Sequence, residues 1–92
     1  MWSALLQHVR IKINGMKAKV LFRGSEDVKN FASEMNGFTS DVNIYYGHQI
    51  FDAKSILCLM SLQLFKEYEV EIISKDELII EQFKSIVAKY GG

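Results

Sequence analysis

Residues 54–62 read Lys54-Ser55-Ile56-Leu57-Cys58-Leu59-Met60-Ser61-Leu62, a short polar opening followed by a run of apolar side chains. Serine is a preferred helix N-cap, because its hydroxyl accepts a hydrogen bond from a free backbone amide two or three residues later. We therefore expect Ser55 to begin a helix. Three apolar residues fit one buried stripe of this helix and three fall largely outside it: Ile56, Leu59 and Met60 within, and Leu57, Cys58 and Leu64 outside.

A helix of about two turns over a small sheet cannot bury all of these side chains, so we expect some apolar surface to be exposed. Exposed apolar patches mark partner sites, and a methionine adapts to differing contacts. Ile56, Leu57 and Met60 are therefore candidate partner-binding residues. The alternative is that Phe65 and the loop before Glu67 fold over the excess.

Segments on both sides of this helix alternate apolar and polar residues, which is the period of a half-buried strand. The predicted strands are Met16–Phe22, Thr39–Tyr46, Gln49–Ala53 and Glu67–Ile73. Their inward residues in the three clear alternations are Ala18, Val20 and Phe22; Val42, Ile44 and Tyr46; and Tyr68, Val70 and Ile72. Gly47-His48 indicates a turn. If the first strand lies beside the last, Lys17 and Lys19 face Glu69 and Glu71, and such pairs help to choose the register.

Two further helices are predicted by apolar residues that recur at steps of three and four. The first begins at Ser25-Glu26-Asp27, a capping hydroxyl followed by two acids, and ends at Asn36-Gly37, where we expect a left-handed residue. The second follows Ser74-Lys75-Asp76-Glu77, which has the spacing of a capping box, and ends at Gly91-Gly92. Their stripes are Val28, Phe31, Ala32 and Met35, and Ile79, Phe83, Ile86, Val87 and Tyr90. The order β-α-β-β-α-β-α predicts an α+β fold whose sheet, antiparallel or mixed, is covered on one face.

Residues 1–15 are interpreted as an N-terminal extension and residues 16–92 as the domain. Alternating residues in the extension lead to a hairpin signal: Val9, Ile11 and Ile13, then Asn14-Gly15. A two-residue turn would set Lys12 opposite Lys17, which is unfavourable, so a hairpin and a loose extension stay open. Met16–Phe22 is predicted at a sheet edge, so the chain is expected to be a monomer or a strand-exchanged homodimer.

The chain has 92 residues, of which 49% are apolar and 24% charged, and this composition fits one globular domain. Cys58 is the only cysteine, so no internal disulfide or thiolate metal site is expected, and a reducing, cytoplasmic setting fits best. The apolar runs fall short of the roughly 20 residues that span a bilayer. Residues 1–25 hold five basic and no acidic residues, but they alternate with apolar ones along a strand, which favours a solvated sheet face over a nucleic-acid surface.

Chemistry-bearing residues are sparse and isolated. The sequence contains no evident carboxylate pair, nucleophile–base arrangement, glycine-rich phosphate loop or metal-spaced cluster, so we expect a protein that is not an enzyme and has no cofactor or metal. His48 lies in the predicted turn and His8 in the extension, and isolated exposed histidines are usually plain polar residues. Capping accounts for Ser25.

Three stretches carry a family resemblance: Gly37-Phe38-Thr39-Ser40, Ala53-Lys54-Ser55-Ile56 and Met60-Ser61-Leu62. In spacing and identity they resemble the HPr (histidine-containing phosphocarrier) family of the bacterial phosphotransferase system, over about residues 16–90. The resemblance implies an HPr-like open-faced β-sandwich, with four antiparallel strands and three helices on one face.

The start of the first helix departs from this family. In the family, a Gly-Leu-His-Thr-Arg-Pro-like run precedes the helix, and its histidine carries the phosphoryl group. Counting back from Gly37 places Gly24 at the histidine, Ser25 at the threonine, Glu26 at the arginine and Asp27 at the proline. Glycine has no nucleophile, so the resemblance implies a member without carrier activity. A phosphocarrier that uses a displaced histidine, such as His48, is the alternative.

The resemblance also implies a regulatory role for Ser55, which matches the serine that a dedicated HPr kinase phosphorylates in serine-regulated members. The nearest model is a catabolite-repression homologue that lacks the histidine, keeps this serine and binds a transcription regulator of the lactose-repressor type. Cys58 and Gln63 replace glycines common in the family. We therefore expect a regulatory protein with protein partners, and no nucleic acid or membrane.

Overall fold

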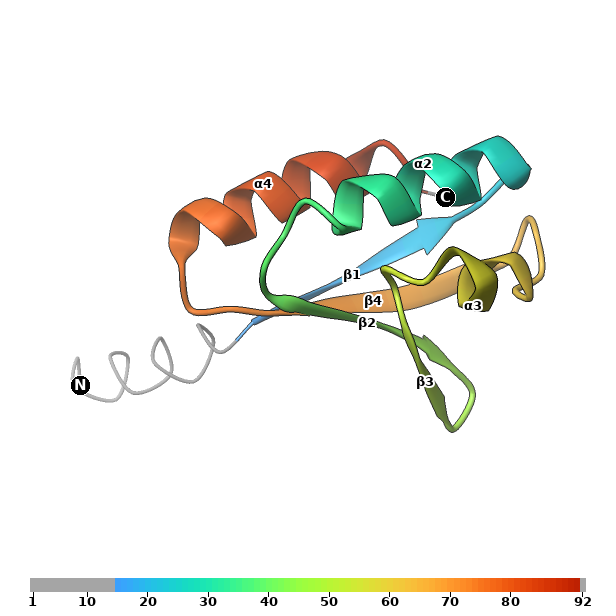
Figure 1. Cartoon of the computed structure of the whole chain (residues 1–92), viewed down its shortest axis with the longest axis horizontal. Helices are drawn as coiled ribbons and strands as arrows, with labels where there is room; N and C mark the ends of the chain where they lie inside the picture. Colours follow the sequence, from blue (N-terminus) through green and yellow to red (C-terminus); the bar gives the residue numbers. More distant parts are fainter. Residues whose placement is uncertain (1–14, 92) are drawn as a thin grey trace, which may run out of the picture.

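A computed structural model describes residues 15–91 as an open-faced sandwich, a four-stranded antiparallel sheet with three helices on one face (Figure 1). The strands lie in the order β1-β4-β2-β3. The elements in chain order are β1 (Met16–Leu21), α2 (Ser25–Met35), β2 (Asp41–Tyr46), β3 (Gln49–Asp52), α3 (Ile56–Met60), β4 (Glu67–Ile73) and α4 (Glu77–Ala88). The predicted order and fold class are confirmed, and the sheet is antiparallel throughout.

The first strand lies beside the last, which is the condition under which the sequence sets Lys17 and Lys19 opposite glutamates. Lys17 is the register partner of Glu71, and Lys19 that of Glu69. The ion pair itself is diagonal, because the Lys19 Nζ lies 3.8 Å from an Oε1 of Glu67. The Lys17 ammonium instead lies 5.4 Å from the centre of the Tyr45 ring, so neither lysine forms an ion pair with its direct register partner.

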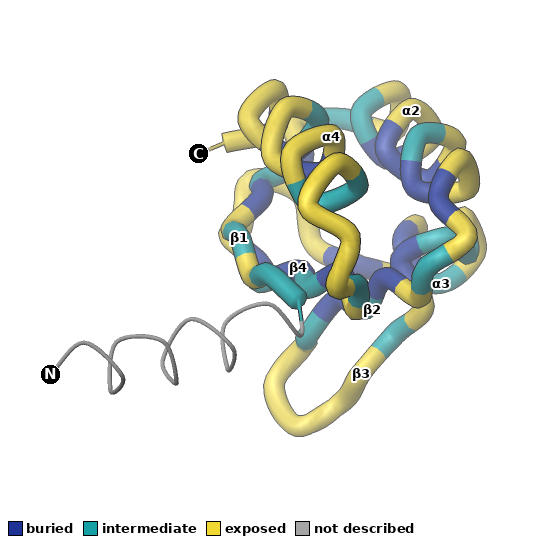
Figure 2. The backbone as a smooth tube through the Cα atoms, turned by 90° about the vertical axis from the view of Figure 1, so that its left-hand side faces the viewer, coloured by how far each residue is buried: buried dark blue, intermediate teal, exposed yellow. Residues whose placement is uncertain are grey.

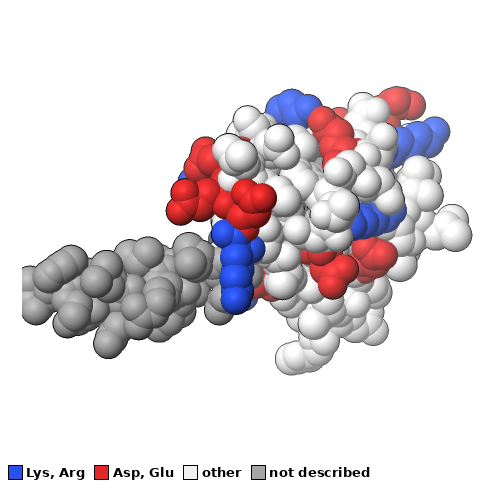
Figure 3. Space-filling view, turned by 60° about the vertical axis from the view of Figure 1, so that its left-hand side comes forward, with Lys and Arg blue, Asp and Glu red and all other residues white. Residues whose placement is uncertain are grey.

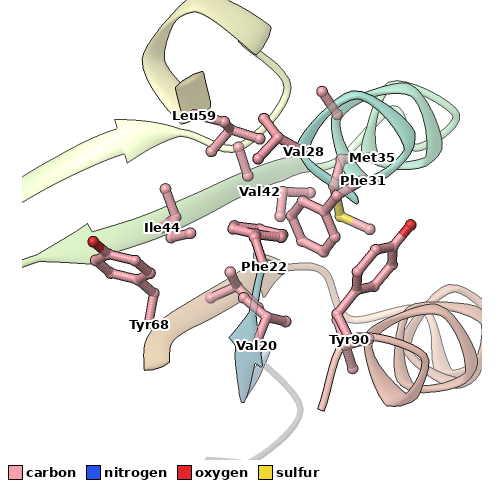
Figure 4. Close-up of a cluster of buried hydrophobic side chains, with 14 of the residues drawn as sticks. Val20, Phe22, Val28, Phe31, Met35, Val42, Ile44, Leu59, Tyr68 and Tyr90 are labelled. Carbon is pink, nitrogen blue, oxygen red and sulfur yellow. The ribbon is translucent and has the colours of Figure 1, made fainter. Parts of the chain in front are cut away.

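The core lies between the helices and the inner face of the sheet (Figure 2). Its aromatic centre is Phe22, Phe31 and Tyr90, which pack edge to face with ring centres 5.1–6.1 Å apart. Figure 4 shows these rings beside Val28 and Met35 of α2. All of the inward strand residues named from the alternation are buried or half-buried, except Tyr46.

Tyr46 lies on the predicted side of its strand but is 38% exposed. It stacks on Phe51, with ring centres 6.0 Å apart. The Lys66 ammonium lies 5.4 Å from the ring centre, so a cation–π contact partly covers the exposed ring.

Two predicted helix N-caps are wrong. Gly24 rather than Ser25 is the N-cap of α2, without a side-chain cap, and the Arg23 amide donates to Asp27 Oδ2 at 2.9 Å. Asp76 caps α4 by accepting from the Leu78 amide, while Ser74, two residues earlier, accepts from the Asp76 amide. At α4 two short-range oxygens therefore compete for the helix start, and the one in reach of the N2 amide caps it.

The end of α2 also differs from the expected left-handed residue. Asn36 is right-handed, with φ −66°. Its amide side chain donates to the carbonyls of Ala32 and Lys54, both at 2.8 Å. Asn36 therefore links the end of α2 to the segment before α3, and α2 ends without a left-handed residue.

The turn between β2 and β3 is where it was predicted. Gly47 has φ +61°, which glycine adopts without strain, and His48 follows it. The predicted hairpin of residues 9–13, and the extension boundary it belongs to, lie outside the described residues. Among residues 15–91, no helix is long and apolar enough to cross a membrane.

Candidate functional site

The first candidate position is the start of α2. Gly24 is extended, with φ −175° and ψ 174°, and a Cβ added to it would meet no atom within 4 Å. The backbone would therefore accept any side chain there, and that side chain would project into open space. Ser25 is the exposed first residue of α2 and makes no capping hydrogen bond.

The charged side chains in the first turn of α2 are carboxylates. Glu26 is exposed, and Asp27 is held against the Arg23 amide. The Arg23 guanidinium turns to the other end of the chain, where its Nη2 donates to the Gly91 carbonyl at 3.3 Å. Carboxylates suit the positive end of a helix dipole, but they repel an approaching phosphate.

The second candidate position is Ser55, and its predicted capping role is confirmed. Its Oγ accepts from the Cys58 amide at 3.3 Å, and its carbonyl accepts from the Leu59 amide at 3.0 Å. Ser55 is half-buried. The helix that follows has five residues, Ile56–Met60, and is shorter than the two turns expected.

Two residues that sequence reasoning missed hold Ser55 in place. The Lys54 Nζ donates to the Phe38 carbonyl at 2.7 Å, and Asn36 donates to the Lys54 carbonyl. These bonds join the end of α2 to the segment before α3. The signal was present, because the bonds connect the two stretches on which the family resemblance rests, around Gly37-Phe38 and around Ala53-Lys54.

An exposed apolar patch surrounds α3. We define the patch as Ile56, Leu57, Met60, Leu64 and Phe65, which are 39%, 82%, 48%, 41% and 68% exposed. Only Leu59 of α3 is buried, so the prediction that Ile56 and Met60 share its stripe is wrong. A single short turn presents one residue to the core, and more apolar surface is left outside than expected.

Phe65 does not fold over this surface, so that alternative is also wrong. Its φ of +58° turns the side chain outward, while its amide donates to the Phe22 carbonyl at 2.7 Å. This bond sets the patch beside the end of β1, two residues before Gly24. In Figure 1, α3 and the start of α2 lie at the same end of the molecule.

His48 is not part of this arrangement. It is exposed in the β2–β3 turn, and Figure 1 shows this hairpin reaching away from the start of α2. His8 lies outside the described residues. Within residues 15–91, no group of three or more histidine, cysteine, aspartate or glutamate side chains is placed to hold a metal.

Two open hollows follow the seam between α2 and α4, away from α3. One is lined by Glu34, Gly37, Phe38, Gln82, Ser85 and Ile86, and the other by Asp27, Asn30, Ser33, Glu34, Lys89 and Tyr90. Neither hollow is lined by a residue of α3.

The fold defines a small α+β protein, an open-faced sandwich with an exposed apolar patch beside Ser55. The family model described as the PTS HPr component phosphorylation site matches residues 27–89, and the chain therefore belongs to the HPr family of the phosphotransferase system. The matched region begins after Gly24, Ser25 and Glu26 and includes Ser55. Members of this family interact with other phosphotransferase proteins.

Two solved structures share the fold. HPr-C-His from Thermoanaerobacter tengcongensis is 14% identical with a TM-score of 0.62, over 82% of this chain and 91% of that one. The phosphocarrier protein HPr from Bacillus anthracis is 19% identical with a TM-score of 0.64, over 83% of this chain and 96% of that one. No curated protein matches the chain by sequence.

Proposed function

We propose that this chain is a non-enzymatic, HPr-like regulatory or interaction protein without phosphohistidine carrier activity. One observation supports the proposal: Gly24 is the N-cap of α2, and by the count back from Gly37 it takes the position of the family's phosphoryl-accepting histidine. Imidazole is suited to accept and release a phosphoryl group, and glycine offers no nucleophile. Glu26, in place of an arginine, adds repulsion where a phosphate would need a cation.

The direct test is incubation with phosphoenolpyruvate and the general phosphotransferase enzyme. We expect no acid-labile phosphate on this chain, while the Bacillus anthracis phosphocarrier, treated in parallel, becomes labelled. Acid-labile phosphate on this chain would contradict the proposal. Its loss in a His48→Ala variant would then establish the alternative, a phosphocarrier that uses His48.

A gain-of-function variant sharpens this test, because the backbone at Gly24 accepts a side chain without a clash. Gly24→His combined with Glu26→Arg should fold and acquire acid-labile phosphate. Glu26→Arg alone is the matched control and should stay unlabelled. If the double variant folds and stays unlabelled, Gly24 and Glu26 do not account for the missing activity.

We further propose that protein partners bind the apolar patch, in particular Ile56, Leu57 and Met60, and that phosphorylation of Ser55 switches this binding. Ser55 caps α3 directly beside the patch. A phosphate there adds about −1.5 to −2 charges at pH 7. Lys54 is the neighbouring cation. The partners that fit this surface are an HPr kinase and a transcription regulator.

The test of the switch uses a serine-specific HPr kinase. We expect the kinase to modify this chain once and to leave Ser55→Ala unmodified. Ser61→Ala is the matched control, because Ser61 lies at the other end of the same helix and only donates to the Cys58 carbonyl. Equal modification of the wild-type chain and Ser55→Ala would refute the proposal.

A further inference from the structure

The two edges of the sheet are β1 and β3, and they are protected to different degrees. At β1, the outward Leu21 amide already donates to the Tyr90 carbonyl at 2.7 Å. β3 has only four residues, which limits pairing, but it carries no lysine, proline or bulge and pairs with β2 residue for residue. The edge of β3 is therefore the one more open to a further strand.

A two-residue turn determines the direction of the backbone groups in β3. Tyr46 and Gln49 close this turn, and the carbonyl of the first residue of such a turn accepts from the amide of the fourth. Bonded and non-bonded pairs then alternate along an antiparallel ladder. The Ala53 amide continues the bonded series by donating back to the strand β2 at 2.9 Å. The N–H and C=O groups of Ile50 and Asp52 therefore point to the free edge.

Three of these four outward groups are unpaired within the described chain. The Asp52 carbonyl accepts from the Ser55 amide at 3.1 Å. The Ile50 N–H, the Ile50 C=O and the Asp52 N–H have no bond to any residue between 15 and 91. The Ile50 side chain is 60% exposed on the open face of the sheet, next to its register partner Tyr45. Ile50 thus combines an exposed apolar side chain with a free donor and a free acceptor.

The hairpin that carries this edge is accessible. Figure 1 shows it reaching away from α2 and α4, and Figure 2 shows β3 exposed along most of its length. Residues 42–51 contain no lysine, arginine, aspartate or glutamate. In Figure 3, the lower tip of the molecule, where this hairpin lies, shows no charged side chain. A second strand can therefore approach the edge without removing water from a row of charges.

The edge is complementary to itself. A two-fold axis perpendicular to the sheet pairs two β3 strands antiparallel. With Ile50 opposite Ile50 of a second copy, the free N–H and C=O groups of the two isoleucines face each other. The same register sets His48 of each copy opposite Asp52 of the other. Asp52 Oδ1 accepts from the Lys54 amide at 2.9 Å, and its Oδ2 has no partner within residues 15–91, so it can accept from the histidine ring, which has an N–H donor in either protonation state.

The next register along the edge is less favourable. Sliding one copy by two residues would set Ile50 opposite Asp52, so an apolar side chain would face a carboxylate. It would also set His48 opposite Lys54, two groups with no acceptor for each other's charge. The backbone bonds would then need the Asp52 carbonyl, which already accepts from Ser55. The edge therefore favours the register that is centred on Ile50.

We propose that the outer edge of β3 pairs with β3 of a second copy of this chain, with Ile50 opposite Ile50 and His48 opposite Asp52. Two four-stranded sheets then become one continuous sheet. A stable interface uses roughly 20–30 residues a side, so this short contact gives a reversible dimer that forms at high protein concentration. The inference goes beyond the proposed function and does not depend on it, because it uses neither Gly24 nor Ser55.

Sedimentation equilibrium of the full-length protein tests the dimer directly. We expect the mean mass to rise reversibly towards that of a dimer as the protein concentration approaches about 1 mM. Ile50→Lys should raise the dissociation constant about tenfold or more, because two apolar side chains lose their contact and like charges replace them. Ile73→Lys is the matched control, since Ile73 is 44% exposed in β4, away from this edge. It should dimerise like the wild type.

A complementation experiment tests the register. His48→Glu sets two carboxylates opposite each other, and Asp52→Lys sets an ammonium opposite the histidine, so each variant alone should dimerise more weakly than the wild type. An equimolar mixture of the two variants should dimerise more strongly than either alone. In the mixed dimer the introduced carboxylate faces the introduced ammonium, and the remaining His48 faces the remaining Asp52.

Three results would overturn the proposal. A chain that stays monomeric up to about 1 mM would leave this edge to an extended strand of another protein. A dimer that Ile50→Lys does not weaken would place the contact elsewhere, as in strand exchange through β1. A mixture that associates no more strongly than the separate variants would exclude the register that sets His48 opposite Asp52.

Discussion

At the scale of single residues, Ser55 has a structural role that is separable from its proposed regulatory one. Its Oγ accepts from the Cys58 amide and so satisfies the start of α3. Ser55→Ala should lower the free energy of unfolding by about 1 kcal/mol, whereas Ser55→Gly should cost only a few tenths. Urea denaturation of both variants measures the difference. Equal losses would mean that the hydroxyl does not cap α3 in solution.

Glu34 should make the folding stability of the protein depend on pH in the acidic range. Burial raises the pKa of this carboxyl, but hydrogen bonds from Lys89 and Tyr90 and the Lys89 charge outweigh burial and lower the pKa below 4.5. Since the folded-state pKa is the lower one, the stabilisation is present above pH 4.5 and is lost as the pH falls through the folded-state pKa.

Glu34→Gln tests this dependence. The wild-type chain should lose stability as the pH falls below about 4.5, and the variant should lose less over the same interval because its amide does not titrate. Urea midpoints at neutral pH and in this acidic interval measure the effect. Glu81→Gln, on the exposed side of α4, is the control. Identical pH profiles for the wild type and Glu34→Gln would exclude this role.

At the scale of elements, α3 has one buried side chain that stabilises the fold and exposed side chains that form the proposed binding surface. Leu59 is fully buried, and Leu57 is 82% exposed two residues away. Leu59→Ala should cost about 2–5 kcal/mol, whereas Leu57→Ser should stay within about 0.5 kcal/mol of the wild type. Denaturation midpoints measure both. If partners bind the apolar patch, Leu57→Ser should also weaken that binding, and a wild-type affinity would remove Leu57 from the patch.

The elements themselves were predictable, because alternation and helical spacing both report burial. The sequence did not select which strands are neighbours, but it did predict that Lys17 and Lys19 face Glu69 and Glu71 if the first strand lies beside the last, as it does. Helix ends were less predictable, since Ser74 and Asp76 both offer a capping oxygen and only the final backbone path selects Asp76. Ile56 and Met60 were assigned to the core because the length of α3 was overestimated. The position of Gly24 in the family pattern, and the roles of Ser25, Glu26 and Ser55, stay predictions.

At the scale of the whole molecule, the turn after α4 holds α2, α4 and the edge of the sheet together. Tyr90 contacts Phe22 of the segment after β1 and Phe31 of α2, and its hydroxyl donates to Glu34 at 2.6 Å. Its carbonyl accepts from the Leu21 amide at the edge of β1. One residue therefore joins α2, the end of α4 and the sheet edge, which blunts that edge against pairing with another chain.

Two substitutions distinguish the contribution of the Tyr90 hydroxyl from that of the Tyr90 ring. Tyr90→Phe keeps the ring and removes the hydroxyl, so it should cost roughly 1–3 kcal/mol because the Glu34 carboxylate loses a hydrogen bond. Tyr90→Ala also empties the aromatic centre and should cost about 3–5 kcal/mol. Native-state hydrogen exchange adds the decisive measurement: the Leu21 amide should stay protected in Tyr90→Phe and lose protection in Tyr90→Ala, because only the latter frees the turn from the core. If the Leu21 amide exchanges equally fast in the wild type and Tyr90→Ala, the last turn does not hold the edge of β1, and that edge is available for the strand exchange considered from the sequence.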